Sequence, residues 1–131
     1  YEKITLYQRM DAITTKKELL DMQEEIKDNY GKLPKAVQLL FEKKRLDILL
    51  NEPHVENITE EQKFVNVTFT SAWSTRIDGV KLFEMMTSIS KDTRIRYVNS
   101  KISMKLPKTK DWLYKMVEIL ERTDELVIKN A

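Results

Sequence analysis

The spacing of apolar residues along this chain changes from a helical period to a strand period at Pro53. Before Pro53, apolar residues recur at steps of three and four, which is the spacing of one face of an amphipathic helix. After Pro53 the period becomes two, as in Val65, Val67 and Phe69, which is typical of a strand with one buried face. The sequence therefore predicts an α+β fold with its helices first.

Three helices are expected in the first part, over residues 2–13, over residues 15–30 and from residue 34 toward Pro53. Thr15 and Glu18 match a capping box, in which each side chain accepts a hydrogen bond from a backbone N–H at the start of a helix. Gly31 stands where a left-handed C-terminal cap is expected. The predicted buried stripe of the second helix is Leu19, Met22, Gln23, Ile26 and Tyr30.

Two strand-strand-helix units are expected after Pro53. Their strands are predicted over residues 55–59, 65–70, 94–99 and 101–106, and their helices over residues 80–89 and from residue 109 onward. No Gly-, Ser- or Pro-rich linker separates the parts, so we expect a single domain over residues 1–131, with a helical part at 1–53 and a strand-containing part at 54–131. The chain begins at Tyr1, inside a helical pattern, which favours a fragment of a longer protein.

Several chemistries need residue types that this sequence lacks. It has no Cys and only two Gly, so disulfides, thiolate sites and a glycine-rich phosphate loop are excluded. His54 is the only histidine and is expected to be a structural or surface residue. We therefore expect no catalytic residues, no metal and no cofactor. The alternative of a small hydrolase requires a pair of buried Asp or Glu side chains in an apolar cleft.

Acidic residues gather on one side of the predicted second helix, opposite its apolar stripe. These residues are Asp21, Glu24, Glu25 and Asp28. Like charges four residues apart repel, so the helix gains no stability from this arrangement. One interpretation is a solvated face, partly neutralised by Lys17 and Lys27. The other is a docking face for a basic partner.

Basic residues cluster around the second predicted strand pair, with Tyr97 and Trp112 nearby. The main members are Arg94, Arg96, Lys101 and Lys105, with Lys91, Lys108 and Lys110 beyond them. A basic sheet face with aromatic residues is one way to bind single-stranded nucleic acid. The alternative is a solvated face whose charges protect a sheet edge from aggregation. Trp73 lies in a predicted loop and either anchors a partner or packs in the core.

Two segments of the first part resemble a known family. They are ITLYQRM at residues 4–10 and EIKDNYGKLP at residues 25–34, with Leu19 between them and Val37 and Leu40 behind. This pattern resembles the opening of the C-terminal regulatory domain of bacterial transcription-repair coupling factor, in which an acidic segment ends with Asp, an aromatic residue, Gly and Pro in fixed register. Asn29 departs from the pattern, because the family usually has Arg at that position.

The resemblance implies a bacterial, cytoplasmic parent protein that recognises RNA polymerase stalled at a DNA lesion, moves along DNA as an ATP-dependent translocase and recruits the repair protein UvrA. It implies that this domain is a non-catalytic, monomeric, autoinhibitory clamp on the UvrB-like module of the same polypeptide, where it covers the surface that UvrA uses. Glu25 and Asp28 fall within the motif, so we expect them to contact basic residues of that module, with Asp21 and Glu24 strengthening the field.

Overall fold

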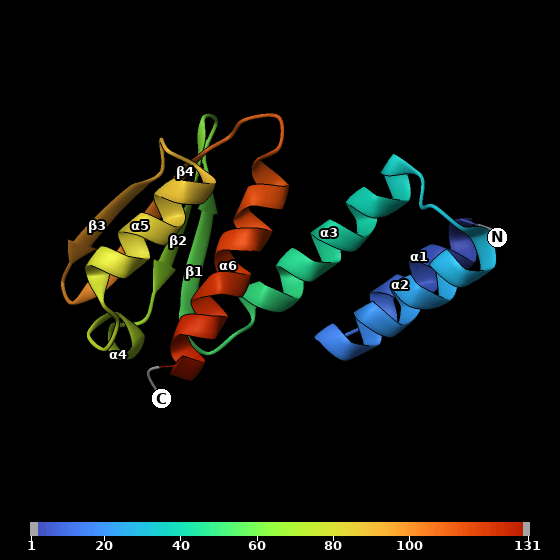
Figure 1. Cartoon of the computed structure of the whole chain (residues 1–131), viewed down its shortest axis with the longest axis horizontal. Coiled ribbons are helices and arrows are strands. Elements are labelled where there is room, and N and C mark those ends of the chain that lie inside the picture. The colour runs from blue at the N-terminus through green and yellow to red at the C-terminus, as the bar shows by residue number, and fades with distance from the viewer. Residues whose placement is uncertain (1–2, 130–131) are drawn as a thin grey trace. The chain divides into compact units, whose positions relative to one another are not determined.

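The computed structural model describes residues 3–129 and divides the chain into two compact units, Tyr1–Ile48 and Leu49–Ala131. Six helices and four strands are assigned within the described residues, with the helical unit first (Figure 1). The α+β prediction is confirmed. The boundary between the units falls within the third helix, a few residues before the predicted division at Pro53, and the single-domain organisation stays a prediction.

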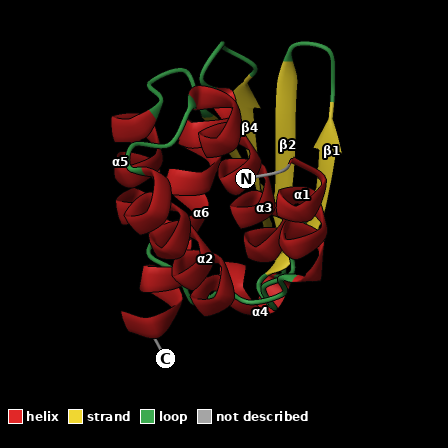
Figure 2. Cartoon of the chain, turned by 90° about the vertical axis from the view of Figure 1, so that its right-hand side faces the viewer, coloured by secondary structure: helices red, strands yellow, loops and turns green. Residues whose placement is uncertain are grey.

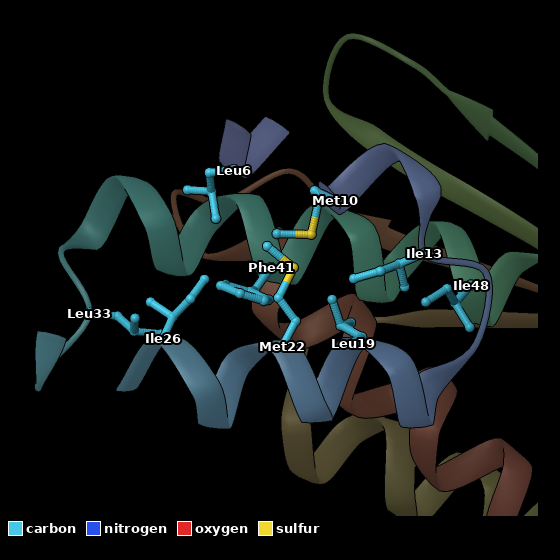
Figure 3. Close-up of a cluster of buried hydrophobic side chains, with 9 residues drawn as sticks. All are labelled: Leu6, Met10, Ile13, Leu19, Met22, Ile26, Leu33, Phe41 and Ile48. Atoms are coloured by element: carbon cyan, nitrogen blue, oxygen red, sulfur yellow. The ribbon is translucent and has the colours of Figure 1, made fainter. Parts of the chain in front are cut away.

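The helical unit contains α1 (Lys3–Ala12), α2 (Lys16–Tyr30) and most of α3 (Lys35–Leu50). All three helices contribute to one apolar cluster, in which Phe41 of α3 is fully buried (Figure 3). The cluster consists of Leu6, Met10, Ile13, Leu19, Met22, Ile26, Leu33, Phe41 and Ile48. A buried phenylalanine of this kind contributes about 3–5 kcal/mol relative to alanine, so this cluster is sufficient to fix how the three helices face one another.

The two ends of α2 show what the sequence predicted well and what it did not. The N-terminal cap is confirmed, because the Thr15 hydroxyl accepts the backbone N–H of Glu18 at 3.2 Å. Tyr30 was wrongly placed in the buried stripe: it is 55% exposed at the last position of α2, and Leu33 enters the core instead. Gly31 has a φ of 74° with a ψ of −139°, which is a positive-φ conformation other than the predicted left-handed helical one.

The second unit is built on a four-stranded antiparallel sheet of order β1-β2-β4-β3. The strands are β1 (Val55–Glu60), β2 (Phe64–Phe69), β3 (Arg94–Val98) and β4 (Lys101–Pro107). Figure 2 shows β1, β2 and β4 side by side in this order. The helices are α4 (Ser71–Ser74), α5 (Gly79–Ile89) and α6 (Trp112–Lys129). The last predicted helix thus begins at Trp112 and ends at Lys129.

Every second residue of the two central strands is buried, as the period of two predicted. The buried residues are Val65, Val67 and Phe69 of β2 and Ile102, Met104 and Leu106 of β4. In Figure 1, α5 and α6 lie on one side of this sheet, and α6 contributes buried residues such as Met116 and Ile119. The other side of the central strands therefore carries their polar residues.

Three aromatic rings close one end of this core. Trp73 lies in the single helical turn α4, which begins at a Thr70 cap where a loop was expected. Its ring is 4.6 Å from Phe69 and 5.4 Å from His54 between centroids. His54 is only 7% exposed, and its Nε2 lies 3.2 Å from the Thr123 hydroxyl. His54 is thus a structural residue, and Trp73 is a core residue instead of an exposed anchor.

The turn between β3 and β4 holds two non-glycine residues in a conformation that favours glycine. Asn99 has a φ of 54° and Ser100 a φ of 64°. A positive φ costs an ordinary residue roughly 1–2 kcal/mol, whereas asparagine tolerates it better. We expect Ser100→Gly to raise the free energy of unfolding by about 0.5–1 kcal/mol, after the greater chain entropy of glycine is counted. Thermal unfolding would show this as a rise of about 2–4 °C.

Asn99→Gly is the matched control for this prediction, because it changes the neighbouring residue of the same turn. We expect it to give a smaller gain, since asparagine already populates positive φ more readily. A gain for Asn99→Gly that equals or exceeds that of Ser100→Gly would contradict the explanation.

Candidate functional site

The acidic face of α2 consists of Asp21, Glu24, Glu25 and Asp28, and all four side chains are exposed. The rotation of α2 about its axis follows from its buried residues, because Leu19, Met22 and Ile26 face the core of the helical unit. The structure thus brings the four predicted residues together on one face, as the helical period requires.

One of these four carboxylates already has a partner within the same unit. Glu25 forms an ion pair of 2.5 Å with Arg9 of α1, across the gap between the two helices. Among residues 3–129, Asp21, Glu24 and Asp28 take part in no ion pair or hydrogen bond of their side chains. Lys17 and Lys27, which were expected to neutralise this face in part, therefore form no ion pair with these three carboxylates among the described residues. The three carboxylates are available to another molecule or domain.

The start of α2 shapes the electrostatics of its first turn. The Thr15 hydroxyl donates to Glu18 Oε1 at 3.0 Å, and the Thr14 hydroxyl donates to the same oxygen at 3.2 Å. The hydrogen bond from Thr15 is the main cause that lowers the pKa of the exposed Glu18 below its usual value. Glu18 therefore stays ionised at the positive end of the helix dipole.

The basic face lies on the side of the sheet opposite to α5 and α6. Strand register places Arg94 beside Lys105, and Arg96 beside Ser103, on this side. Lys101 and Lys105 of this face, and Lys108 beyond it, pair with glutamates of β1 and of the β1–β2 turn. The pairs are Lys101 with Glu56 at 2.9 Å, Lys105 with Glu61 at 3.7 Å and Lys108 with Glu60 at 2.6 Å. Much of the predicted positive field is thus neutralised within the unit.

An aromatic residue that was not among the predicted members, Phe64, lies on the basic face. Arg94 and Lys105 lie 5.8 Å and 5.0 Å from the centre of its ring, so cations already cover it. Tyr97 was expected beside these cations, but it pairs with Ile102, whose side chain points to the other side of the sheet. The alternation of Phe64, Asn66 and Thr68 with buried residues is the signal that would have identified Phe64.

The outer members of the predicted basic cluster are dispersed. Lys108 lies 6.0 Å from the ring of Trp112 at the beginning of α6. Lys91 precedes β3 and Lys110 precedes α6, and among the described residues neither forms an ion pair. These residues do not extend the face formed by Arg94, Arg96, Lys101 and Lys105 into one continuous surface.

Acid–base and metal chemistry find no support among the residues that the structure describes. No Asp or Glu side chain is buried among those whose burial the structure describes, so these side chains offer no carboxylate pair of the kind that a hydrolase requires. The same residues contain no group of three or more His, Asp or Glu side chains able to hold a metal ion. No helix within residues 3–129 has the length and apolar character to cross a membrane.

The fold and these two faces define an α+β domain whose charged groups lie on exposed surfaces. The sequence profile of the TRCF domain family matches residues 1–80, which is more than half of the chain. The chain therefore belongs to the TRCF domain family.

Individual relatives agree with this assignment. The chain is 33% identical over 84 residues to the transcription-repair-coupling factor of Bacillus subtilis, which covers 64% of the chain and 7% of that protein. It is 22% identical over 111 residues to the same factor of Staphylococcus epidermidis, which covers 85% of the chain and 10% of that protein. The chain thus spans at most a tenth of the length of these relatives.

A solved structure shares the fold. The crystal structure of a C-terminal domain of transcription-repair coupling factor matches 98% of this chain and 83% of its own chain, with a TM-score of 0.70 and 18% identity. This match extends over both compact units, whereas the family profile ends at residue 80. The α+β arrangement of the second unit is thus that of a known domain.

The capping box at the start of α2 gives a prediction for pH dependence. Because the folded-state pKa of Glu18 is lowered, its contribution to stability is present above the unfolded pKa and is lost as the pH falls through the folded value. We expect Thr15→Val to raise the pKa of Glu18 toward 4.5, since the main stabilising hydrogen bond is removed. A titration of the Glu18 side chain by NMR would measure this shift.

Thr14→Val serves as the matched control, because it removes the lesser of the two hydroxyl hydrogen bonds to Glu18. Its effect on the Glu18 pKa should be smaller than that of Thr15→Val. An unchanged Glu18 pKa in the Thr15→Val protein would show that the capping box does not form in solution.

Proposed function

We propose that this chain is a non-catalytic regulatory domain of a transcription-repair coupling protein and acts in transcription-coupled DNA repair. Membership of the TRCF domain family supports this role, as do the names of the similar proteins. The further mechanism rests on one observation, which is that Asp21, Glu24 and Asp28 are exposed and unpaired among the described residues.

In this proposal the acidic face of α2 docks on basic residues of a UvrB-like module in the same polypeptide. The docked domain covers the surface that UvrA would use and restrains an ATP-dependent DNA translocase elsewhere in the parent protein. Engagement of RNA polymerase favours the released state. Such a clamp is an equilibrium between two states, and a ligand shifts it only through different affinities for the two.

The electrostatic cost of the acidic face supports a docking role. Asp21 with Glu25, and Glu24 with Asp28, are like charges four residues apart, and each such pair costs about 0.2–0.5 kcal/mol. Asp28 also lies near the C-terminus of α2, where the helix dipole disfavours an anion. The ion pair with Arg9 reduces this repulsion only at Glu25. A basic surface placed against α2 would remove the remaining repulsion.

The expected strength of docking suits a reversible switch. Ion pairs between exposed side chains contribute about 0.2–1 kcal/mol each, because water and salt screen them. A few such pairs shift an equilibrium near balance by roughly tenfold, since about 1.4 kcal/mol corresponds to that factor. The acidic face is therefore suited to shift the equilibrium between the docked and released states, while other contacts supply most of the docking free energy.

Removing unpaired charges from this face should release the clamp. We expect Glu24→Gln combined with Asp28→Asn, in the full-length protein, to increase both ATP hydrolysis and the affinity for UvrA by about 2- to 20-fold. Steady-state ATPase assays and equilibrium binding to UvrA would measure these changes. Glu25 is retained because its loss would also break the ion pair with Arg9.

Glu84→Gln combined with Asp92→Asn is the matched control. Like the test variant, it removes the negative charges of one Glu and one Asp, here at exposed positions in α5 and in the turn before β3. This variant should behave as the unmodified protein in both assays. Equal effects of the two double variants would attribute the result to net charge, and no effect of Glu24→Gln with Asp28→Asn would refute docking through the acidic face.

A further inference from the structure

One edge of the sheet, formed by β3, is open to another strand. The strand order β1-β2-β4-β3 places β3 at the end of the sheet, with only β4 as a neighbour. Within residues 3–129, the main-chain groups of Ile95 and Tyr97 form no hydrogen bond with any segment outside β3 and β4. Figure 1 shows β3 at the end of the sheet with α5 alongside.

Strand register determines which main-chain groups point outward from β3. The two-residue turn at Asn99 and Ser100 makes Val98 and Lys101 the first paired residues, so hydrogen-bonded pairs recur at Arg96 and Arg94. The main-chain groups of Ile95 and Tyr97 therefore point away from β4. Ile102 of β4 lies opposite Tyr97, so its N–H likewise points away from β3. This N–H donates a hydrogen bond to the Ser74 hydroxyl at 2.9 Å.

The two sides of β3 differ in chemistry. Arg94 and Arg96 face the open side of the sheet, together with Lys105 of β4. Ile95 and Tyr97 face the side of the helices, where Phe83 of α5 is 53% exposed and Tyr97 is 59% exposed. A groove of about 790 Å³ includes residues of both sides of β3, namely Phe83, Ile95, Arg94 and Arg96. It continues from β3 across the open side of the sheet, where Ser103 and Lys105 of β4, Asn66 and Thr68 of β2 and Thr59 of β1 line it. Thr93, which is buried at the start of β3, also lines it, and among the described residues its hydroxyl has no hydrogen-bond partner.

The opposite edge of the sheet does not share these features. The pairing of β1 is interrupted by a register shift between Val55 and Asn57, and such bulges hinder the addition of a strand. Glu56 and Glu60 of β1 are engaged by Lys101 and Lys108 of the same unit. Regular pairing, exposed apolar residues and free main-chain groups therefore coincide at β3 alone among the described strands.

We propose that the β3 edge binds an extended segment of another polypeptide in which acidic and apolar residues alternate. Main-chain hydrogen bonds to Ile95 and Tyr97 extend the sheet by one strand. Acidic residues of the segment lie beside Arg94 and Arg96, and its apolar residues lie beside Tyr97 and Phe83, because side chains of a strand alternate between the two faces. This binding is independent of the acidic face on α2.

Two other occupants fit less well. A second copy of β3 would place arginines beside arginines, which disfavours a symmetric strand pair. Single-stranded nucleic acid would meet Arg94, Arg96 and Lys105, yet Lys105 is paired with Glu61 and the cations cover the ring of Phe64. The nucleic acid would leave the free main-chain groups and the apolar side of β3 unused, and the second copy would use both but with arginines opposed to arginines.

A peptide of about seven alternating valine and glutamate residues is a suitable probe, since it exceeds the length of β3. Fluorescence anisotropy with the 131-residue chain should show saturable binding to this peptide, and amide exchange should become slower at Ile95 and Tyr97. Arg96→Glu should weaken this binding about tenfold and favour a valine–lysine peptide instead. Arg76→Glu, an exposed residue outside the sheet, is the control with the same charge change.

Tyr97→Pro gives a second test that does not depend on charge. It removes an outward N–H without removing a hydrogen bond to β4, so the sheet is retained while binding is lost. Equal binding of a peptide with the same residues in blocks, or protection of amides away from β3, would overturn the proposal. It would also be overturned by concentration-dependent self-association alone, or by tighter, steeply salt-dependent binding of a single-stranded oligonucleotide that Arg96→Glu abolishes.

Discussion

Burial of the apolar stripe of α2 around Phe41 is the constraint on which the acidic face depends. Leu19, Met22 and Ile26 are all nearly inaccessible to water, so α2 cannot rotate without exposing them. Each fully buried side chain of this size contributes about 1.5–3 kcal/mol, which exceeds the few tenths of a kcal/mol that repulsion between the carboxylates costs. The apolar core therefore holds Asp21, Glu24 and Asp28 in an arrangement that electrostatics alone would avoid.

The features that the sequence predicted correctly are those determined by near neighbours in the chain. The period of three to four residues placed α2, and the period of two placed β2 and β4, because each depends only on which side of an element is buried. Thr15 was identified as a cap because its hydrogen bond reaches only to Glu18. The acidic face followed from the same geometry, and its four members all proved to be exposed.

The features that the sequence did not predict depend on contacts between distant segments. Arg9 could not be assigned to Glu25, because their pairing requires α1 and α2 to lie side by side. The neutralisation of Lys101 and Lys105 by Glu56 and Glu61 likewise depends on the order of the strands. Tyr30 was misplaced for a related reason, since the chain turns at Gly31 and returns Leu33 to the core in its place.

Ion pairing separates the two charged faces more clearly than their residue composition does. The acidic face of α2 and the basic face of the sheet each contain four charged residues within a short segment, so composition alone does not show which of them binds a partner. On the sheet, glutamates of β1 and its turn pair with Lys101 and Lys105, so a polyanion would have to displace existing partners at these lysines, whereas Arg94 and Arg96 form no ion pair among the described residues. On α2, three carboxylates have no such competitor among the described residues, so a basic surface would gain attraction without first breaking an ion pair at these positions.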